Sequence, residues 1–398
     1  MTLLALVLLA LAVAVCVYAY VGYPLLLKVL TPYPPLRSGE GGRPESPRTW
    51  PRISIVLPAH NEAESIHATL ERIVAIDYPR DRRQILVVSD ASTDATDHIV
   101  LGFGQGVELL RQPVRSGKTA AENAARAHLT GDIIINTDAS VRIDAAAVKH
   151  LVAALDDPSV GVASGRDMSV SNLDTRANPG EQAYVGYDMW VRDLETRVYG
   201  IVGASGCLYA IRRDLHLYEM PEGLSRDFGS ALVARRQGYR AVSVPEAICY
   251  VPRISSLKRE YRRKVRTIAR GLRTLWYMRA LLNPRRYGVF AWMLWSHKIA
   301  RWLVPWMAVL AGVALAVLAP GNAWAGLAIA GGAAALLVAA IGWLWPEGRP
   351  LPRPVSMLAY GVSGNIAALR AWLTAMGRQH TALWEPTRRG PVAAPPHP

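Results

Sequence analysis

The chain has 398 residues, is 51% hydrophobic and carries a formal net charge of +14 at pH 7. We do not expect a nucleic-acid partner, because the chain shows no zinc-finger spacing, RNA-binding aromatic signature or helix-turn-helix pattern. Much of the positive charge clusters at 253–286, beside a long apolar block, and cations in that position are typical of contact with an anionic membrane leaflet. The three cysteines have no metal-ligand or disulfide spacing, which suits a reducing compartment.

The first segment in chain order is an apolar anchor. Residues 2–27 contain no charged side chain, and about 20 apolar residues suffice to cross a bilayer. A cleaved signal peptide fits less well, because no Lys or Arg precedes the run and the run exceeds the usual ~7–15 residues. We expect an anchor at 1–30 and a linker rich in Pro and Gly at 31–51. The basic residues between Lys28 and Arg52 predict that the following domain lies in the cytoplasm.

Strand-like and helix-like segments alternate over the next hundred residues. Strands are expected at 53–58, 84–89 and 132–136, and helices at 61–75 (capped by Asn61), 93–100, 118–128 and 144–155. This alternation predicts an α/β fold with an open, mostly parallel sheet covered by helices on both faces. Ligands bind such sheets at the carboxyl ends of the strands.

Polar side chains follow each of the three predicted strands. They lie in Pro-Ala-His-Asn-Glu at 58–62, Asp-Ala-Ser-Thr-Asp at 90–94 and Thr-Asp-Ala-Ser at 137–140. A carboxylate at the end of a buried strand is costly unless it is paired or binds a metal. Together these segments suit a ligand with a base, a ribose and a diphosphate, which requires a divalent cation held by oxygen ligands. A helix cap is the alternative role for Asp94.

These motifs, in this order, resemble the family 2 glycosyltransferases, which have a GT-A nucleotide-sugar-binding fold. The resemblance covers residues 52–275. It continues beyond the first three motifs through Gly117-Lys118, GASGCLYAIRR at 203–213, Asp227, Gly-Tyr-Arg at 238–240 and Pro-Glu-Ala at 245–247. The apolar segments at both ends resemble the integral-membrane bacterial branch of the family.

The resemblance implies a donor-binding set and a metal site. The donor-binding residues would be Pro58, His60, Glu62, Asp90, Asp94, Lys118, Asp138 and Arg266. Within this set Asp90 would bind the nucleotide base, and Lys118 would lie near the diphosphate. Asp138 matches the first acid of the DxD motif and would ligate Mg²⁺ or Mn²⁺ together with Ser140. Because a hydroxyl is a weaker ligand than the usual third-position Asp or Asn, we expect a less tightly held cation.

The resemblance also implies a catalytic base, Asp227. One carboxylate suffices for a single displacement that inverts the anomeric centre, so we predict inversion. Arg226 stands where the family commonly has another acid, and it would lower the pKa of Asp227 if the two side chains approach. A cap on a helix at 228–237 is the alternative role for Asp227.

Arg266 matches the arginine of the Gln-x-x-Arg-Trp motif of processive members. Arg263 and Thr267 replace the Gln and Trp of that motif, so processive synthesis and single addition both stay open. A membrane-facing basic surface is the alternative reading of this segment.

An acceptor site is expected within 181–209, where aromatic side chains suit the apolar faces of sugars. The aromatic residues are Tyr184, Tyr187, Trp190 and Tyr199, and the candidate acceptor-binding residues are Gly206, Trp190 and Glu195. Packing in the protein core is the alternative role for these side chains.

The remaining segments complete the predicted domain organisation. We expect a cytosolic GT-A domain at 52–255, basic interfacial helices at 256–301 and two transmembrane helices at 302–345. Residues 346–398 are expected to form a membrane-associated or re-entrant helix and a tail, because Asn365 and Arg370 interrupt the apolar run.

The sequence therefore predicts an inverting, metal-dependent glycosyltransferase of the inner membrane with a cytoplasmic catalytic domain. It would move a sugar, with UDP as the expected nucleotide, to a membrane-associated acceptor in polysaccharide or glycolipid synthesis. The expected partners are the nucleotide-sugar, the glycan or lipid acceptor and membrane lipids, and a homo-oligomer stays open. The alternative is a catalytically silent scaffold that binds nucleotide-sugar, which the presence of both Asp138 and Asp227 argues against.

Overall fold

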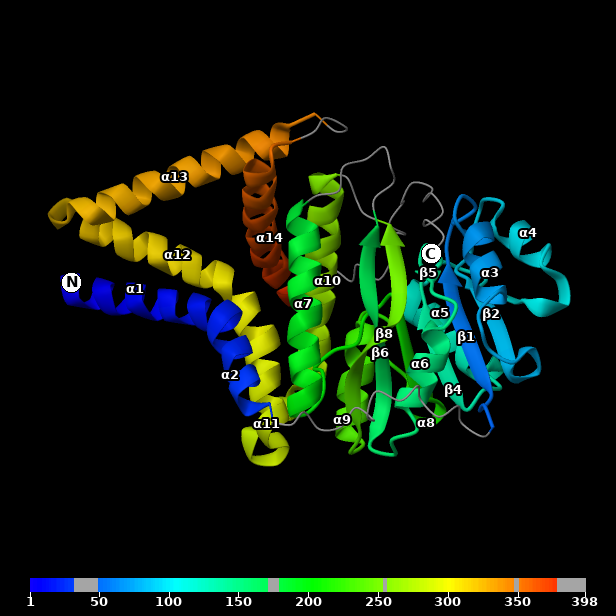
Figure 1. Cartoon of the computed structure of the whole chain (residues 1–398). Coiled ribbons are helices and arrows are strands. Elements are labelled where there is room, and N and C mark those ends of the chain that lie inside the picture. The colour runs from blue at the N-terminus through cyan, green and yellow to red at the C-terminus, as the bar shows by residue number, and fades with distance from the viewer. Residues whose placement is uncertain (32–48, 171–178, 253–255, 347–350, 378–398) are drawn as a thin grey trace.

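The structure, a computed structural model, describes residues 1–31, 49–170, 179–252, 256–346 and 351–377. Most of the predicted linker and of the C-terminal tail lies outside these residues. Figure 1 shows a sheet with helices against it, a group of upright helices beside it, and apolar helices that project away from the sheet.

Eight strands of the described chain form one sheet, in the order β3-β2-β1-β4-β7-β6-β8-β5. They are β1 (Ile53–Ala59), β2 (Arg83–Ser89), β3 (Glu108–Arg111), β4 (Ile133–Thr137), β5 (Arg142–Ile143), β6 (Val160–Val170), β7 (Leu208–Arg212) and β8 (Arg240–Pro252). The pairs β1–β2, β1–β4, β2–β3 and β6–β8 are parallel, whereas β7 is antiparallel to both neighbours and β5 to β8. The sheet is mostly parallel, as predicted, and its reversed strand β7 lies beyond the predicted alternation.

The sheet separates two apolar cores. Successive side chains of a strand point to opposite faces, so Val56 of β1 joins one core while Ile55 and Leu57 join the other. The helices of this half are α3 (Ile66–Val74), α4 (Thr96–Leu101), α5 (Lys118–Ala125) and α6 (Ala147–Ala154). Strand β1 is buried along its whole length. The polar groups that follow it therefore lie where the carboxyl end of the strand emerges from the core.

The first predicted helix begins later than expected. Helix α3 starts at Ile66 with Ser65 in the N-cap position, so the prediction that Asn61 caps it is wrong. Asn61 instead has a φ of +53° and accepts a hydrogen bond from the backbone N–H of Thr93. The loop after β1 therefore contacts the loop after β2 before the helix begins.

The second half of the chain adds five helices that do not belong to the candidate membrane spans. They are α7 (Pro179–Val198), α8 (Arg213–His216), α9 (Arg226–Arg236), α10 (Leu257–Tyr277) and α14 (Arg353–Met376). Helices α7, α10 and α14 run side by side between the sheet and the projecting helices (Figure 1). They form the layer that joins the two parts of the molecule.

Three helices of the described chain are long and apolar enough to cross a membrane: Thr2–Leu30, Pro284–Gly321 and Ala323–Leu344. The first contains α1 (Thr2–Val17) and α2 (Tyr23–Leu30), and the second contains α11 (Pro284–Leu294) and α12 (Arg301–Leu318). The third is α13 (Ala323–Leu344). The predicted interfacial segment up to residue 301 is continuous with α12, joined by a π-helical turn at Trp295–Ala300. Helix α14 is not among these candidate spans, and the prediction of a membrane-associated or re-entrant helix there stays a prediction.

Candidate active site

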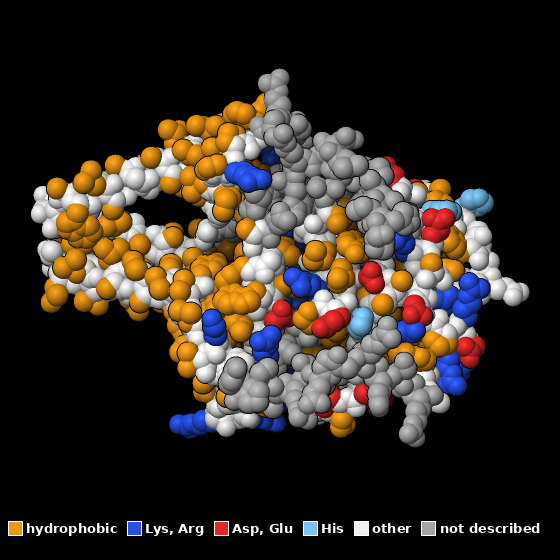
Figure 2. Space-filling model, viewed as in Figure 1, with side chains coloured by type: hydrophobic (Ala, Val, Ile, Leu, Met, Phe, Trp, Pro, Cys, Tyr) orange, Lys and Arg blue, Asp and Glu red, His pale blue; other side chains and the backbone are white. Residues whose placement is uncertain are grey.

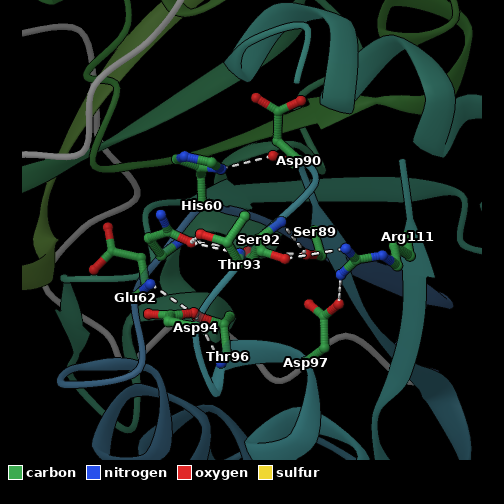
Figure 3. A network of polar contacts seen from close by, with 11 residues as sticks. His60, Glu62, Ser89, Asp90, Ser92, Thr93, Asp94, Thr96, Asp97 and Arg111 are labelled. Atoms are coloured by element: carbon green, nitrogen blue, oxygen red, sulfur yellow. Dashed lines mark hydrogen bonds and ion pairs between the residues drawn. The ribbon is translucent and has the colours of Figure 1, made fainter. Parts of the chain in front are cut away.

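Hydrogen bonds join the loop after β1 to the loop after β2 (Figure 3). Asp94 accepts the backbone N–H of Ala63 at 3.1 Å, and its other oxygen accepts the backbone N–H and the hydroxyl of Thr96 at 3.0 and 2.5 Å. Burial alone would raise the pKa of Asp94, but these hydrogen bonds hold it below its ordinary value. Asp94 therefore holds the first residue of α4, although Ala95 occupies the N-cap position of that helix. Its donor-binding role stays a prediction.

Two residues in these loops have strained backbones. Asn61 and Ala91 have φ values of +53° and +52°, a conformation that costs residues other than glycine ~1–3 kcal/mol and clusters at functional sites. Both lie two residues past the carboxyl ends of the parallel strands β1 and β2. The strain therefore lies where the sequence predicts the nucleotide.

Asp90 is held by the loop that leads into α5. Its side chain is buried, and its two oxygens accept the backbone N–H groups of Ser116 at 2.7 Å and Gly117 at 2.8 Å. Gly117 has a φ of +94°, which only glycine adopts readily. Because each carboxylate oxygen has two lone pairs, Asp90 retains acceptor capacity toward a base N–H.

The other predicted base-pocket residues lie beside Asp90. His60 is buried, and its Nδ1 is 2.7 Å from the backbone oxygen of Asp90. Glu62 accepts the hydroxyl of Ser65 at 2.6 Å, while its backbone N–H donates to Thr96. Pro58 is buried within β1. The structure brings these residues together at one edge of the sheet.

A second cluster forms where three elements meet at the ends of β4 and β7. Lys118, at the start of α5, places its Nζ 2.5 Å from Asp138 Oδ1 and donates to the backbone oxygen of Gly206 at 3.2 Å. Burial alone would lower the pKa of Lys118, but the charge of Asp138, reinforced by Glu122 and Asp227, raises it above its ordinary value. A permanent cation therefore lies beside Asp138.

Asp227 belongs to the same cluster. It lies in the first turn of α9, and its Oδ1 accepts the hydroxyl of Ser225. Its Oδ2 lies against Gly206, where a Cβ would be only 2.6 Å away. Ser225 occupies the N-cap position of α9, so a capping role does not account for Asp227.

Arg226 turns away from Asp227. Its guanidinium is buried and donates to Asn123 Oδ1 at 2.7 Å and to the backbone oxygen of His216. The contact ties α9 to α5 and α8. The close approach of Arg226 to Asp227 considered from the sequence therefore does not occur, and Arg226 stabilises the helix packing behind the site.

The residues at the end of β4 fit a cation that is shared with a substrate. Asp138 and Ser140 are both half-buried and supply two hard oxygen ligands. Within the described residues no group of three or more His, Cys, Asp or Glu side chains could form a metal cage. Magnesium is usually bound by one or two carboxylates together with substrate phosphates, so this ligand set suits a metal–diphosphate complex.

The structure adds two charged residues that the motifs did not reveal. Glu122 is buried one helical turn after Lys118, and burial raises its pKa, an effect that Lys118 and Arg226 partly offset. Arg270 of α10 donates to the hydroxyl of Thr119 at 2.7 Å, next to Lys118. The i, i+4 spacing of Lys118 and Glu122 is a sequence signal for one of them, whereas Arg270 has no local signal.

Two further predicted residues, Arg266 and Trp190, lie on the helices α10 and α7. Arg266 is half-buried on α10 one turn before Arg270, so the two share a helix face. Trp190 on α7 is 45% exposed and packs against the ring of Tyr187. Their donor-binding and acceptor-binding roles stay predictions.

Glu195, predicted to bind the acceptor, lies elsewhere. It is fully buried between α7 and the apolar helices, where its Oε1 accepts the hydroxyl of Tyr23 at 2.5 Å and lies 2.6 Å from His297 Nδ1. In this position Glu195 joins helices, and its acceptor role stays a prediction.

Comparisons with known proteins converge on one class of protein. Residues 54–217 match the family model described as "Glycosyl transferase family 2". The probable glycosyltransferase YdaM of Bacillus subtilis is 34% identical over 129 residues, 31% of this chain and 31% of that protein. The beta-monoglucosyldiacylglycerol synthase of Nostoc sp. is 26% identical over 168 residues, 41% of this chain and 36% of that protein. The chain therefore matches about a third of the length of these curated relatives.

A solved structure extends the likeness to the flanking helices. A mannosyltransferase from Pyrobaculum calidifontis, in complex with GDP-Man and Mn²⁺, has a TM-score of 0.68 and 25% sequence identity to this chain. The match covers 91% of this chain and 99% of the other. It therefore includes the apolar helices as well as the sheet.

Proposed function

We propose that this chain, whose residues 54–217 match the family 2 glycosyltransferase model, transfers a sugar from a nucleotide-sugar to a membrane-associated acceptor with inversion. The main support for this proposal is that Lys118, Asp138 and Asp227 converge around Gly206. These groups come from α5, the end of β4 and α9, and two of them reach Gly206, so separate parts of the chain build one site.

The two clusters suit the two ends of the donor. Asp90, with His60 beside it, offers acceptor atoms to the base at the ends of β1 and β2. Lys118 offers a fixed positive charge to the diphosphate at the end of β4. These positions lie at the carboxyl ends of the neighbouring parallel strands β2, β1 and β4, where α/β proteins bind nucleotides.

Asp227 is the proposed general base. Its carboxylate accepts the acceptor hydroxyl's proton as that oxygen bonds to the anomeric carbon and the nucleoside diphosphate leaves. The Ser225 hydroxyl and the bare Cα of Gly206 keep the carboxylate in position. Lys118 stabilises the negative charge that develops on the leaving diphosphate.

Asp138 and Ser140 are the residues proposed to hold a divalent cation. When bound there, Mg²⁺ or Mn²⁺ supplies Lewis-acid neutralisation of the diphosphate. The Pyrobaculum relative was solved with GDP-Man and Mn²⁺, so GDP-sugars join UDP-sugars as leading donors. Cytoplasmic placement of the site remains part of the proposal, supported by the basic residues that follow the first apolar helix.

The test is nucleotide release from UDP-, GDP- and dTDP-sugars in washed membranes, with Mg²⁺, with Mn²⁺ and after chelation. The wild type is compared with Asp138→Ala and Asp227→Asn, and Asp214→Asn serves as control because Asp214 is exposed on α8. We expect one donor class to be consumed in a metal-dependent way, with losses of at least ~100-fold in the first two variants and none in the control. If no donor is consumed, the chain is a nucleotide-sugar-binding scaffold and the proposal fails. If a donor is consumed and both site variants match the wild type, the assignment of Asp138 and Asp227 is wrong.

A further inference from the structure

An apolar cavity of about 460 Å³ lies between α10, α13 and α14. Its volume falls within the ~300–1,000 Å³ typical of ligand sites. Its walls include Trp343 and Leu344 of α13, Val362 and Ile366 of α14, and Tyr261 of α10, which packs edge-on against Trp343. Helix α13 is a candidate membrane span, so in a bilayer this cavity opens beside hydrocarbon rather than water. We call it the α13–α14 pocket.

The helix that closes the pocket is strongly basic. Helix α10 contains eight Lys or Arg residues and one Glu, and that Glu is paired with Arg263. Lys258 and Arg262, which flank Tyr261 in the sequence, are exposed. Lys264 lies 3.4 Å from the ring of Tyr360 on α14. These three cations thus lie within one helical turn of Tyr261, a residue of the pocket wall.

The pocket lies on the side of the molecule where the catalytic residues are. Strands β6 and β8 run in the same direction as β1 and β4, because two antiparallel pairings through β7 restore the direction. The carboxyl end of β8 therefore lies at the same edge of the sheet as Asp138. Helix α10 begins five residues after β8, and Tyr261 lies about 6 Å along it. Strand β8 is three positions from β4, about 14 Å across the sheet.

We propose that the α13–α14 pocket binds the hydrocarbon chain of a lipid phosphate, whose headgroup lies against the basic start of α10 and is presented to the catalytic site. The apolar walls select a chain, and Lys258 and Arg262 select an anionic headgroup. The inference rests on the proposed function, since it names the acceptor as a lipid phosphate. Figure 2 shows hydrophobic side chains covering the projecting helices, so such a lipid reaches the pocket from the bilayer.

The test is photolabelling of the full chain in phosphatidylcholine vesicles. The probe is phosphatidic acid with a diazirine in its acyl chain, and diacylglycerol with the same chain is the neutral comparison. Ala340→Trp and Val362→Trp fill the pocket from two different helices. Ala334→Trp is the matched control, because Ala334 is an exposed residue of α13 outside the pocket lining. Elution on size exclusion checks that each variant is folded.

We expect phosphatidic acid to label α13 and α14 peptides at the pocket, and both filling variants to reduce this labelling about tenfold while Ala334→Trp does not. Lys258→Gln and Arg262→Gln are each expected to lower the preference for phosphatidic acid over diacylglycerol about fivefold. Arg285→Gln, an exposed cation on α11, is the charge control. Equal labelling by both lipids, or labelling that survives both filling variants, overturns the proposal.

The outcome is independent of turnover. Asp138→Ala, which removes donor consumption under the proposed function, should label like the wild type. Loss of pocket labelling with normal nucleotide release overturns the lipid-phosphate inference and leaves the transferase standing. If the wild type is labelled normally but consumes no donor, the proposed transferase function is wrong. The lipid-phosphate site itself would still stand.

Discussion

At the scale of single residues, the absence of a side chain at Gly206 is what admits the proposed base. An added Cβ would lie 2.6 Å from Asp227 Oδ2, closer than nonbonded atoms approach. The backbone oxygen of Gly206 also accepts from Lys118. One residue therefore contacts both the base and the cation that faces the diphosphate.

We predict that Gly206→Ala reduces transfer about 100-fold, because a displacement of a catalytic group by about 1 Å costs that much. Donor binding, measured by protection against thermal unfolding, should change little. Gly223→Ala is the matched control, since a Cβ there meets nothing within 4 Å. Normal kcat in Gly206→Ala would show that Asp227 does not act from its observed position.

The motifs predicted the main site residues but not the contacts behind them. Asp138 and Asp227 are 89 positions apart in the sequence, and their family roles alone suggested that they meet. Arg270 reaches Thr119 from a helix 151 positions away, and no local pattern encodes such a contact. The orientation of the Arg226 side chain could not be predicted from the sequence either, because it depends on packing against α5 and α8.

At the scale of elements, a buried polar network joins the sheet domain to the apolar helices. This junction network consists of Tyr23 on α2, Asp188 and Glu195 on α7, and His297 and Arg301 at the start of the α12 segment. Asp188 Oδ1 lies 3.2 Å from His297 Nε2 and 2.9 Å from Arg301 Nη1. Buried charges that lose one partner are strongly destabilising, so this network fixes how the helices meet.

The network predicts a pH-dependent stability. Burial alone would raise the pKa of Asp188, but His297 and Arg301 hold it well below its ordinary value. A depressed carboxyl pKa contributes stability that is present above the unfolded pKa of about 3.9 and is lost as the pH falls toward the folded pKa. We expect Asp188→Asn to lower Tm most at neutral pH, with the deficit shrinking below about pH 4. Asp214→Asn should show no deficit, and a deficit for Asp188→Asn that is independent of pH would contradict the assignment.

Element types were easier to predict than element boundaries. The β-branched runs gave β1, β2 and β4 to within one or two residues, because continuous burial leaves a clear pattern. The start of α3 was missed because Asn61 resembles a cap in the sequence while its side chain bonds to Thr93 instead. Strands β6, β7 and β8 pair over long sequence separations, which local periodicity does not reveal.

At the scale of the whole molecule, three crossings by the candidate spans would put both the sheet domain and α14 on one side of the membrane. Helices α1, α12 and α13 project from the same side of the molecule (Figure 1), and α14 packs beside α10 instead of following them. The apolar side chains gather over these projecting helices (Figure 2). The membrane-associated or re-entrant position predicted for the C-terminal helix stays a prediction, which a reporter fusion can test.

We therefore predict that a reporter fused after residue 398 stays in the cytoplasm. A fluorescent-protein fusion should be bright and an alkaline-phosphatase fusion inactive, because phosphatase requires an oxidising compartment. A phosphatase fusion placed after Asn322, between α12 and α13, should be active and serves as the positive control. An active phosphatase at residue 398 would mean that α14 spans the membrane.

The proposed inversion, with Asp227 as the base, is tested most directly by the anomeric configuration of the sugar at the moment of release. Without an acceptor, water can take the place of the acceptor hydroxyl, and proton NMR records the first sugar released before it mutarotates. We expect an α-linked donor to yield the β-sugar and Asp227→Asn to release none, because a single base drives a single displacement. Release of the α-sugar by the wild type, or undiminished release by Asp227→Asn, would contradict this mechanism.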